Sequence, residues 1–191
     1  MLFVIVLVTA VSAATAGEFL HPPSVERRDE IYTVLMNVRI GASRSSIFEA
    51  VTDYENLSRI SESIMSSRIV QEKDLNRMTV LVQLRICILE FFRWKICREF
   101  DQTQQMTASP LLSLRADIPD DGTNIFQGYA EWKFTEEVRG TKVEFRSELT
   151  PLVDVLPILG PWAIKRALRR EAHQIVEGLE RLATKQTADA D

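Results

Sequence analysis

The amino-acid sequence predicts an α+β domain in which a curved antiparallel sheet of about six to seven strands grips one long C-terminal helix. Three observations point to this fold. A strand and helical segments come first, segments with alternating apolar and polar residues fill the middle, and an amphipathic helix closes the chain. A curved antiparallel sheet needs a cover on its concave face, and the closing helix is the element that can supply it.

The first sixteen residues differ from the rest of the 191-residue chain. They carry no charged side chain, they are apolar from Leu2 to Val8, and they end in small residues up to Ala16. This pattern predicts a signal peptide over residues 1–16 and export to a bacterial periplasm. Because no Lys or Arg precedes the apolar run, an uncleaved N-terminal membrane anchor is the alternative.

The next elements follow from composition and periodicity. Residues 17–30 are polar and contain two consecutive prolines, so we expect an N-terminal arm or linker there. Residues 31–40 alternate as a half-buried strand does. Ser43 or Ser45 can cap the helix that follows, and a second short helix is expected over 54–61.

The middle of the chain has the pattern of a strand meander. Proline cannot donate to a sheet ladder, so one of its strands is expected to bend near Pro110. The predicted strands are 67–71, 78–89, 92–100, 106–118, 126–135 and 141–149. The closing helix is expected from Trp162 to Thr184, which gives one domain over 31–185 and a polar tail over 186–191.

Charge and cysteine content exclude several classes of protein. The net charge of −4 gives the whole molecule no attraction to nucleic acid. Cys87 and Cys97 share the outward face of neighbouring strands, and they can form a disulfide if the register places them opposite each other. His21 and His173 provide neither a metal cluster nor a Ser–His or Cys–His pair, so we expect no metal, no cofactor and no catalytic residue.

The order of the motifs resembles that of the START-like superfamily, also called SRPBCC, in its polyketide cyclase/dehydrase and coenzyme Q-binding branch. The resemblance covers about 150 residues, and its motifs are a strand that ends at 40–43, a helix over 47–54 with Asp53 and Tyr54 at its end, the segment 128–134 and the turn 140–143. It implies a helix-grip fold with a ligand tunnel. Members of this superfamily bind lipids, sterols, quinones or polyketides, and a minority are enzymes.

The resemblance also implies that the inward faces line a ligand cavity, whereas periodicity alone fits a dry core equally well. Gly128 and Ala130 are small and would leave room beneath the helix or mark a bulge. The expected lining residues are Val80, Val82, Leu84, Ile86, Trp94, Ile96, Phe126, Gly128, Ala130, Trp132, Phe145, Leu168 and Ile175.

An apolar loop and a basic cluster lie where the closing helix begins. Cations in the first turns oppose the helix dipole, so they need another reason to be there. Their position beside apolar residues is typical of docking to an anionic membrane. The expected entrance and membrane contact is Leu156, Ile158, Leu159, Trp162, Lys165, Arg166, Arg169 and Arg170. The alternative is that the loop caps the core and the cations pair with acids such as Asp154 and Glu171.

The sequence therefore predicts a protein that binds or transports a hydrophobic small molecule, such as a lipid or a quinone. One alternative is an enzyme of the polyketide cyclase or dehydratase type, and another is a protein-interaction module. The expected export signal argues against the interaction module, whose relatives associate with ribosomes.

Overall fold

The computed structural model describes residues 17–91, 94–122, 124–152 and 160–188. The signal peptide or anchor expected over residues 1–16 lies outside this part of the chain. Within it the elements are β1 (Glu18–Arg28), β2 (Ile31–Ile40), α1 (Arg44–Thr52), the short 3-10 helix η1 (Leu57–Arg59), β3 (Ile64–Asp74), β4 (Arg77–Phe91), β5 (Trp94–Ser109), β6 (Ser113–Ile118), β7 (Phe126–Glu137), β8 (Gly140–Pro151) and α2 (Gly160–Ala188).

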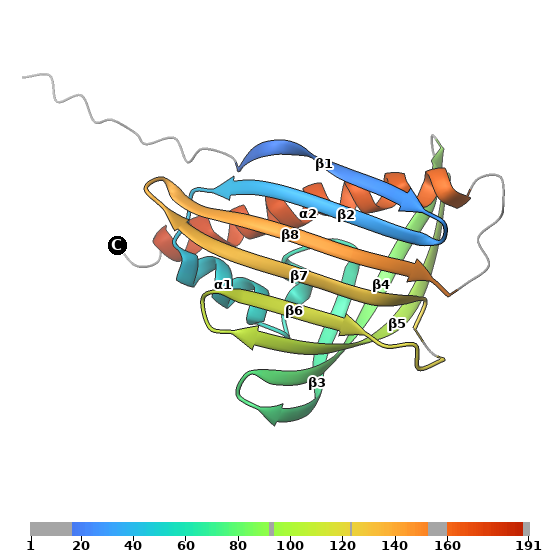
Figure 1. The fold of residues 1–191 in the computed structure, drawn as a ribbon, viewed down its shortest axis with the longest axis horizontal. Coiled ribbons are helices and arrows are strands. Elements are labelled where there is room, and N and C mark those ends of the chain that lie inside the picture. The colour runs from blue at the N-terminus through green and yellow to red at the C-terminus, as the bar shows by residue number, and fades with distance from the viewer. Residues whose placement is uncertain (1–16, 92–93, 123, 153–159, 189–191) are drawn as a thin grey trace, which may run out of the picture.

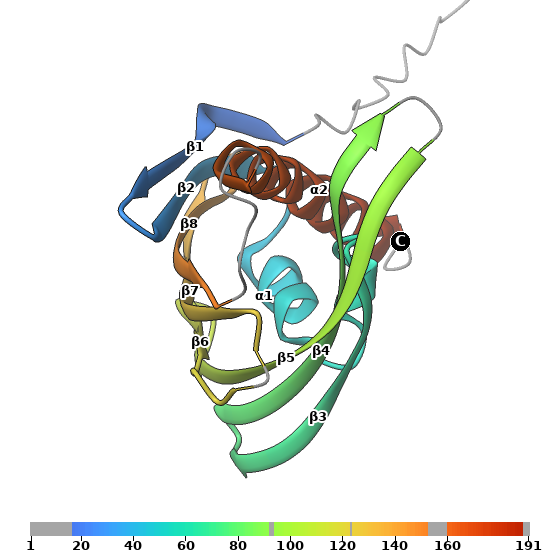
Figure 2. The same cartoon turned by 90° about the vertical axis from the view of Figure 1, so that its right-hand side faces the viewer.

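All eight strands belong to one antiparallel sheet with the order β1-β2-β8-β7-β6-β5-β4-β3 (Figure 1). The sheet curls around α2, so that β1 and β2 lie on one side of the helix and β4 on the other (Figure 2). The helix α1 lies beneath the same concave face, near the C-terminal half of α2. This is the arrangement of a helix-grip fold, with α2 as the gripped helix.

The elements β2 and α1 form where the sequence predicts them, because β2 alternates apolar and polar residues and α1 has a capping serine. In β2 every second side chain, from Tyr32 to Ile40, is buried. Of the two candidate caps of α1, Ser43 takes the role, because its Oγ accepts a hydrogen bond from the Ser46 backbone N–H at 3.1 Å. Tyr54 packs into the core directly after the helix.

The structure differs from the predicted fold at three places. Residues 17–30 are neither arm nor linker: their larger part forms the edge strand β1, in which the ladder shifts register between His21 and Ser24, around the two prolines. The segment 106–118 is two strands, because the chain turns at Pro110. The second helix expected over 54–61 is only the 3-10 turn η1. The sheet therefore has eight strands instead of six to seven, accompanied by two α-helices in the described chain.

The packed core lies at the end of the sheet where α1 is. There the fully buried side chains of Val38, Ile47, Val143 and Leu179 join β2, α1, β8 and α2 in one cluster. Gly178 of α2 packs so tightly on this end that a Cβ atom would lie 1.9 Å from the Ile60 carbonyl oxygen. A side chain at position 178 would therefore push α2 away from the segment that follows η1.

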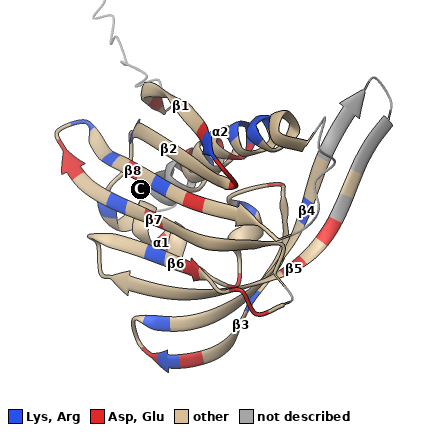
Figure 3. Ribbon diagram, turned by 45° about the vertical axis from the view of Figure 1, so that its right-hand side comes forward, with Lys and Arg blue, Asp and Glu red and all other residues tan. Residues whose placement is uncertain are grey.

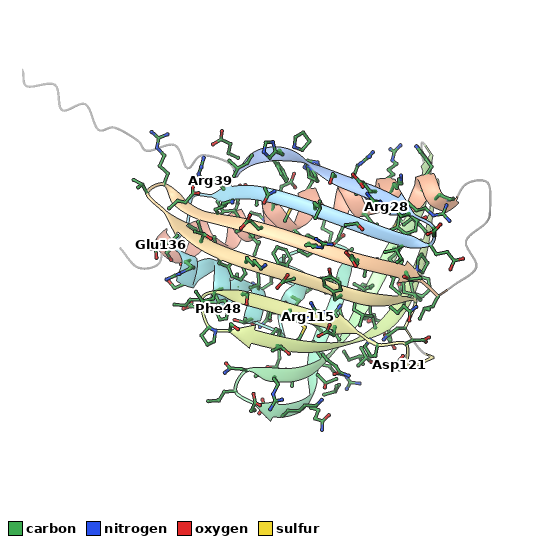
Figure 4. All side chains as sticks on the ribbon, in the orientation of Figure 1. Arg28, Arg39, Phe48, Arg115, Asp121 and Glu136 are labelled. Atoms are coloured by element: carbon green, nitrogen blue, oxygen red, sulfur yellow. A yellow bond between two sulfur atoms is a disulfide. The ribbon has the colours of Figure 1, made fainter. Side chains whose placement is uncertain are left out.

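The convex face of the sheet is a solvated array of ion pairs. Arg39 bonds Glu137 at 2.7 Å, Lys142 bonds Glu144 at 2.9 Å, and Arg115 bonds Asp117 at 2.7 Å. Figure 4 shows Arg39 and Arg115 at this face, turned away from α2. Such exposed pairs contribute little to stability, about 0–1 kcal/mol each. A ligand-binding site for an apolar molecule is therefore to be sought on the concave face.

Candidate ligand-binding face

On β4 and β7 the burial of the inner-face side chains decreases from the α1 end of the sheet toward the end where α2 begins, whereas on β2 and β6 these side chains stay buried along the whole strand. Phe134 of β7 and Val143 of β8 are buried, whereas the next inner-face residues, Trp132 and Phe145, are only half-buried. The strand β4 shows the same change between Val82 and Leu84. Inner-face side chains that keep accessible surface can contact a bound molecule.

The helix α2 shows the same gradient. Val176 and Leu179 are buried over the packed core, whereas Ile164 and Leu168, near the start of the helix, are half-buried. The buried residues around Val34 form a small second cluster, which Phe145, Ile164 and Leu168 join from the sheet and the helix. The half-buried side chains therefore lie between two separate cores.

Trp132 and Phe145 form the aromatic wall of this region. They are directly opposite each other on β7 and β8, with ring centroids 4.4 Å apart and planes inclined by 52°. Phe145 contacts both core clusters. Rings in this position offer a large apolar surface to any molecule that enters between sheet and helix.

Apart from Gly128, the predicted lining residues fall into three groups. Val80 and Val82 belong to the packed core. The side chains of Trp94 and Ile96 lie outside the described part of the chain. The half-buried group, for which a role in ligand binding stays a prediction, comprises Leu84, Ile86, Phe126, Ala130, Trp132, Phe145, Leu168 and Ile175.

Gly128 lies where the backbones of two strands approach each other closely. Its φ is +140°, and a Cβ atom built on it would lie 1.9 Å from the Glu148 carbonyl oxygen of β8. The missing side chain therefore permits close approach of two strand backbones.

Two polar residues near the inner face were not assigned a site role from the sequence. Gln102 of β5 is directly opposite the buried Val82, and its own exposed fraction is 4%. Glu171 of α2 lies between Leu168 and Ile175 along the helix, and the side chains of Ser61 and Ser63 lie close to its carboxyl group. Burial raises the pKa of the Glu171 carboxyl above its usual range, although both serines and the nearby Arg170 oppose this shift.

The sequence contains a signal for both Gln102 and Glu171. Continuing the alternation of the strand at 92–100 by one step would have placed Gln102 on the inward face. Glu171 is an acid inside an apolar helical stripe, three residues after Leu168 and four before Ile175. By sequence alone, Glu171 is also a possible ion-pair partner of the basic cluster.

The disulfide is formed. Cys87 and Cys97 are opposite each other in the β4–β5 ladder, on the outward face as predicted, and their sulfur atoms are bonded at 1.98 Å. The guanidinium group of Arg170 donates a hydrogen bond to the Cys87 carbonyl oxygen at 2.9 Å. Arg170 therefore attaches α2 to this hairpin and is not simply a surface cation.

The expected entrance is only partly described. Leu156, Ile158 and Leu159 lie outside the described residues. Trp162 is exposed over 59% of its surface, and the Arg166 guanidinium carbon lies 5.5 Å from the centre of its ring. The cations of this first part of α2 are visible as a blue cluster in Figure 3.

Two further cations of this cluster, Lys165 and Arg169, make no ion pair with any described residue. The presence of Lys165 and Arg169 is therefore not explained by ion pairs with described acids. None of the described helices is long and apolar enough to cross a membrane.

Comparison with known families agrees with this architecture. Residues 40–180 match the family described as polyketide cyclase / dehydrase and lipid transport. The chain belongs to this family. A search of curated proteins by sequence gives no match.

Solved structures share the fold at low sequence identity. An aromatase/cyclase from Streptomyces sp. R1128 has a TM-score of 0.66 at 11% identity, covering 82% of this chain and 96% of its own. A STAR-related lipid transfer protein from Xanthomonas axonopodis has a TM-score of 0.58 at 11% identity, covering 84% and 99%. A protein from Thermus thermophilus has a TM-score of 0.60 at 15% identity, covering 81% and 98%. At such identities the likeness establishes the fold alone.

Proposed function

We propose that this protein binds a hydrophobic small molecule, lipid-like or quinone-like, between the half-buried end of the sheet and α2. The observation that carries the proposal is the burial gradient on the inner face. Trp132, Phe145 and Leu168 keep accessible surface although they point toward the interior. Each CH₂ group that a ligand buries against them contributes about 0.8 kcal/mol, so a long apolar chain would bind there without any polar contact.

The test is to extract the purified protein with organic solvent and to analyse the extract by mass spectrometry. We expect a bound apolar compound, and we expect added lipids of that class to raise the melting temperature. Ala130 is half-buried on the inner face, opposite the buried residues Ala116 and Ser147. Replacing it with Leu should block uptake, whereas Thr135→Leu on the outer face should not. Equal uptake by both variants would exclude the inner face as the binding site.

We propose further that the start of α2 docks on an anionic membrane surface. The support is the exposed Trp162, which has the Arg166 guanidinium group beside its ring, together with Lys165 and Arg169, which make no ion pair with a described residue. Each cation near an anionic leaflet contributes about 1 kcal/mol, so the three together correspond to roughly a hundredfold in affinity. A carrier that takes up its apolar ligand directly from a bilayer avoids exposing that ligand to water.

The docking proposal is tested by co-sedimentation with vesicles. Wild type should bind vesicles that contain phosphatidylglycerol, less so at high salt, and it should not bind pure phosphatidylcholine. Changing Lys165, Arg166 and Arg169 to Gln should abolish binding, whereas a control with Arg68, Lys73 and Arg139 changed to Gln loses the same charge elsewhere. Arg170 is left intact because it bonds the Cys87 carbonyl. Equal binding by the two triple variants would contradict docking through α2.

The disulfide supports the proposal that the protein acts after export. Cys87 and Cys97 are bonded, and structural disulfides persist in oxidising compartments such as the periplasm. Counting free thiols in protein recovered from the periplasm and from the cytoplasm tests this. Two free thiols in the exported form would contradict it.

A second candidate function is enzymatic, of the polyketide cyclase or dehydratase type. One observation favours it: Glu171 is an acid near the inner face with a raised pKa, as a general acid toward a ligand carbonyl requires. Glu171→Gln should then stop turnover of a poly-β-ketone analogue without weakening its binding. Turnover that is unchanged in this variant would remove the support for the enzyme.

A further inference from the structure

The inner face of β5 carries a carboxamide that the protein does not satisfy. Gln102 is 4% exposed, and its Oε1 atom is buried without a hydrogen-bond partner in the described part of the chain. Its cross-strand neighbour is Val82, which is 1% exposed. A buried polar group that is left unpaired among aliphatic side chains costs free energy, so its presence needs a reason.

Another buried amide of the same region is fully used by the structure. Asn124 is 5% exposed, and its Oδ1 accepts from the Thr103 backbone N–H at 2.7 Å. Its Nδ2 donates to the carbonyl oxygens of Thr103 and Pro119, at 3.3 and 2.7 Å. The fold can therefore satisfy a buried amide beside β5, and Gln102 differs in having its oxygen unpaired.

The position of Gln102 coincides with the boundary of the burial gradient. On the same face, Val80 and Val82 belong to the packed core, whereas Leu84 and Phe100, which are opposite each other one step further along, are half-buried. Gln102 therefore lies where the packed core ends and the accessible region begins. A ligand that enters from the α2 start would meet this amide with its innermost end.

We infer that Gln102 is the polar anchor of the ligand, and that the ligand is a neutral apolar molecule with a hydroxyl group at its leading end. This rests on the proposed binding function. The aliphatic neighbours Val80 and Val82 would penalise a charged group strongly, which disfavours a carboxylate or phosphate in this place. A hydroxyl group fits the amide in either of its two orientations, because it can both donate to the oxygen and accept from the nitrogen.

The inference is tested with a matched pair of probes, 1-dodecanol and dodecane, which are delivered from cyclodextrin and displace an apolar fluorescent dye. The ratio of the two dissociation constants is compared between wild type and Gln102→Leu, so that the different solubilities of the probes cancel. We expect the preference for the alcohol to fall about tenfold in the variant, as the loss of one hydrogen bond in an apolar site predicts. Dodecane binding should be retained.

Three further results complete the test. The control Gln105→Leu, on the exposed outer face of the same strand, should leave the ratio unchanged. Gln102→Leu should melt at or above the wild-type temperature, because it removes an unsatisfied polar group. If Gln102→Leu does not fold, Gln102→Met replaces it, and failure of both to fold would show a structural role and overturn the inference.

The outcomes separate this inference from the proposed function. An unchanged ratio in Gln102→Leu, with both probes bound, would overturn the anchor and leave hydrophobic binding intact. Binding of neither probe to wild type would overturn both.

Discussion

Reduction of the Cys87–Cys97 disulfide should destabilise the protein by about 2.7 kcal/mol. The bond joins residues ten positions apart, so it closes a short loop in the unfolded chain. The chain-entropy relation for a loop of this length gives a loss of about 9 cal/mol/K, or about 2.7 kcal/mol at 25 °C. For a chain of this size each kcal/mol corresponds to about 2–4 °C, so the melting temperature should fall by roughly 5–11 °C.

The assay is a pair of thermal melts, with and without a phosphine reductant, after mass analysis has confirmed the redox state. The variant in which both cysteines are replaced by Ser is the control: it should melt like the reduced wild type and be insensitive to the reductant. Identical melts of oxidised and reduced wild type would refute the reasoning. Such a result would mean that the β4–β5 ladder and the Arg170 contact hold the hairpin without the bond.

Three other substitutions test the description of the inner face and its surroundings. Trp132→Ala should lower the free energy of unfolding by about 2 kcal/mol, less than the roughly 3–5 kcal/mol lost at a fully packed aromatic residue, and it should weaken ligand uptake. A loss of about 3–5 kcal/mol in melting experiments, with normal uptake in binding assays, would indicate a dry core. Gly128→Ala should lower the free energy of unfolding in urea by more than about 1–3 kcal/mol, because the new Cβ would meet the Glu148 carbonyl. Gly122→Ala should lower it by less, because Gly122 has a φ of +77° but open space around it. Because the folded state raises the pKa of the Glu171 carboxyl group, the contribution of this group to folding stability is present below the usual glutamate pKa and is lost as pH rises. The wild type should therefore lose stability relative to Glu171→Gln between acidic and mildly alkaline pH. Parallel curves of unfolding free energy against pH for the two proteins would contradict this.

Strands with strict alternation and a helix with a clear cap could be predicted from the sequence. The segment 31–40 alternates, and its inward residues are the buried ones in β2. Cys87 and Cys97 share parity with charged neighbours, which placed them on the outer face, although only the register could show that they are paired. Local periodicity thus determines which face a side chain occupies, whereas partner and register depend on the whole sheet.

The missed strand and the missed turn both involve proline. Proline in the segment 17–30 was interpreted as a sign of a linker, but at the edge of a sheet a missing N–H costs little, and β1 accommodates it where the register shifts. Pro110 was expected to bend one strand, and it begins the turn between two. Composition alone does not distinguish a proline in a linker from one in an edge strand or a turn. The difference is whether a neighbouring strand needs the backbone N–H that proline lacks.

The location of the candidate site depends on packing that no periodic pattern records. Gly178 allows α2 to approach the Ile60 carbonyl, so the helix is pressed against the fold at its C-terminal half, where Val176 and Leu179 are buried. Toward its start, the larger residues Ile164 and Leu168 face the second cluster and remain half-buried. The apolar stripe is continuous in the sequence, yet among its large described residues only Val176 and Leu179, in the C-terminal half of the helix, are buried. We infer that the accessible region follows from this closure, which predicts that a larger residue at 178 would loosen the packed end and weaken the difference between the two ends of the inner face.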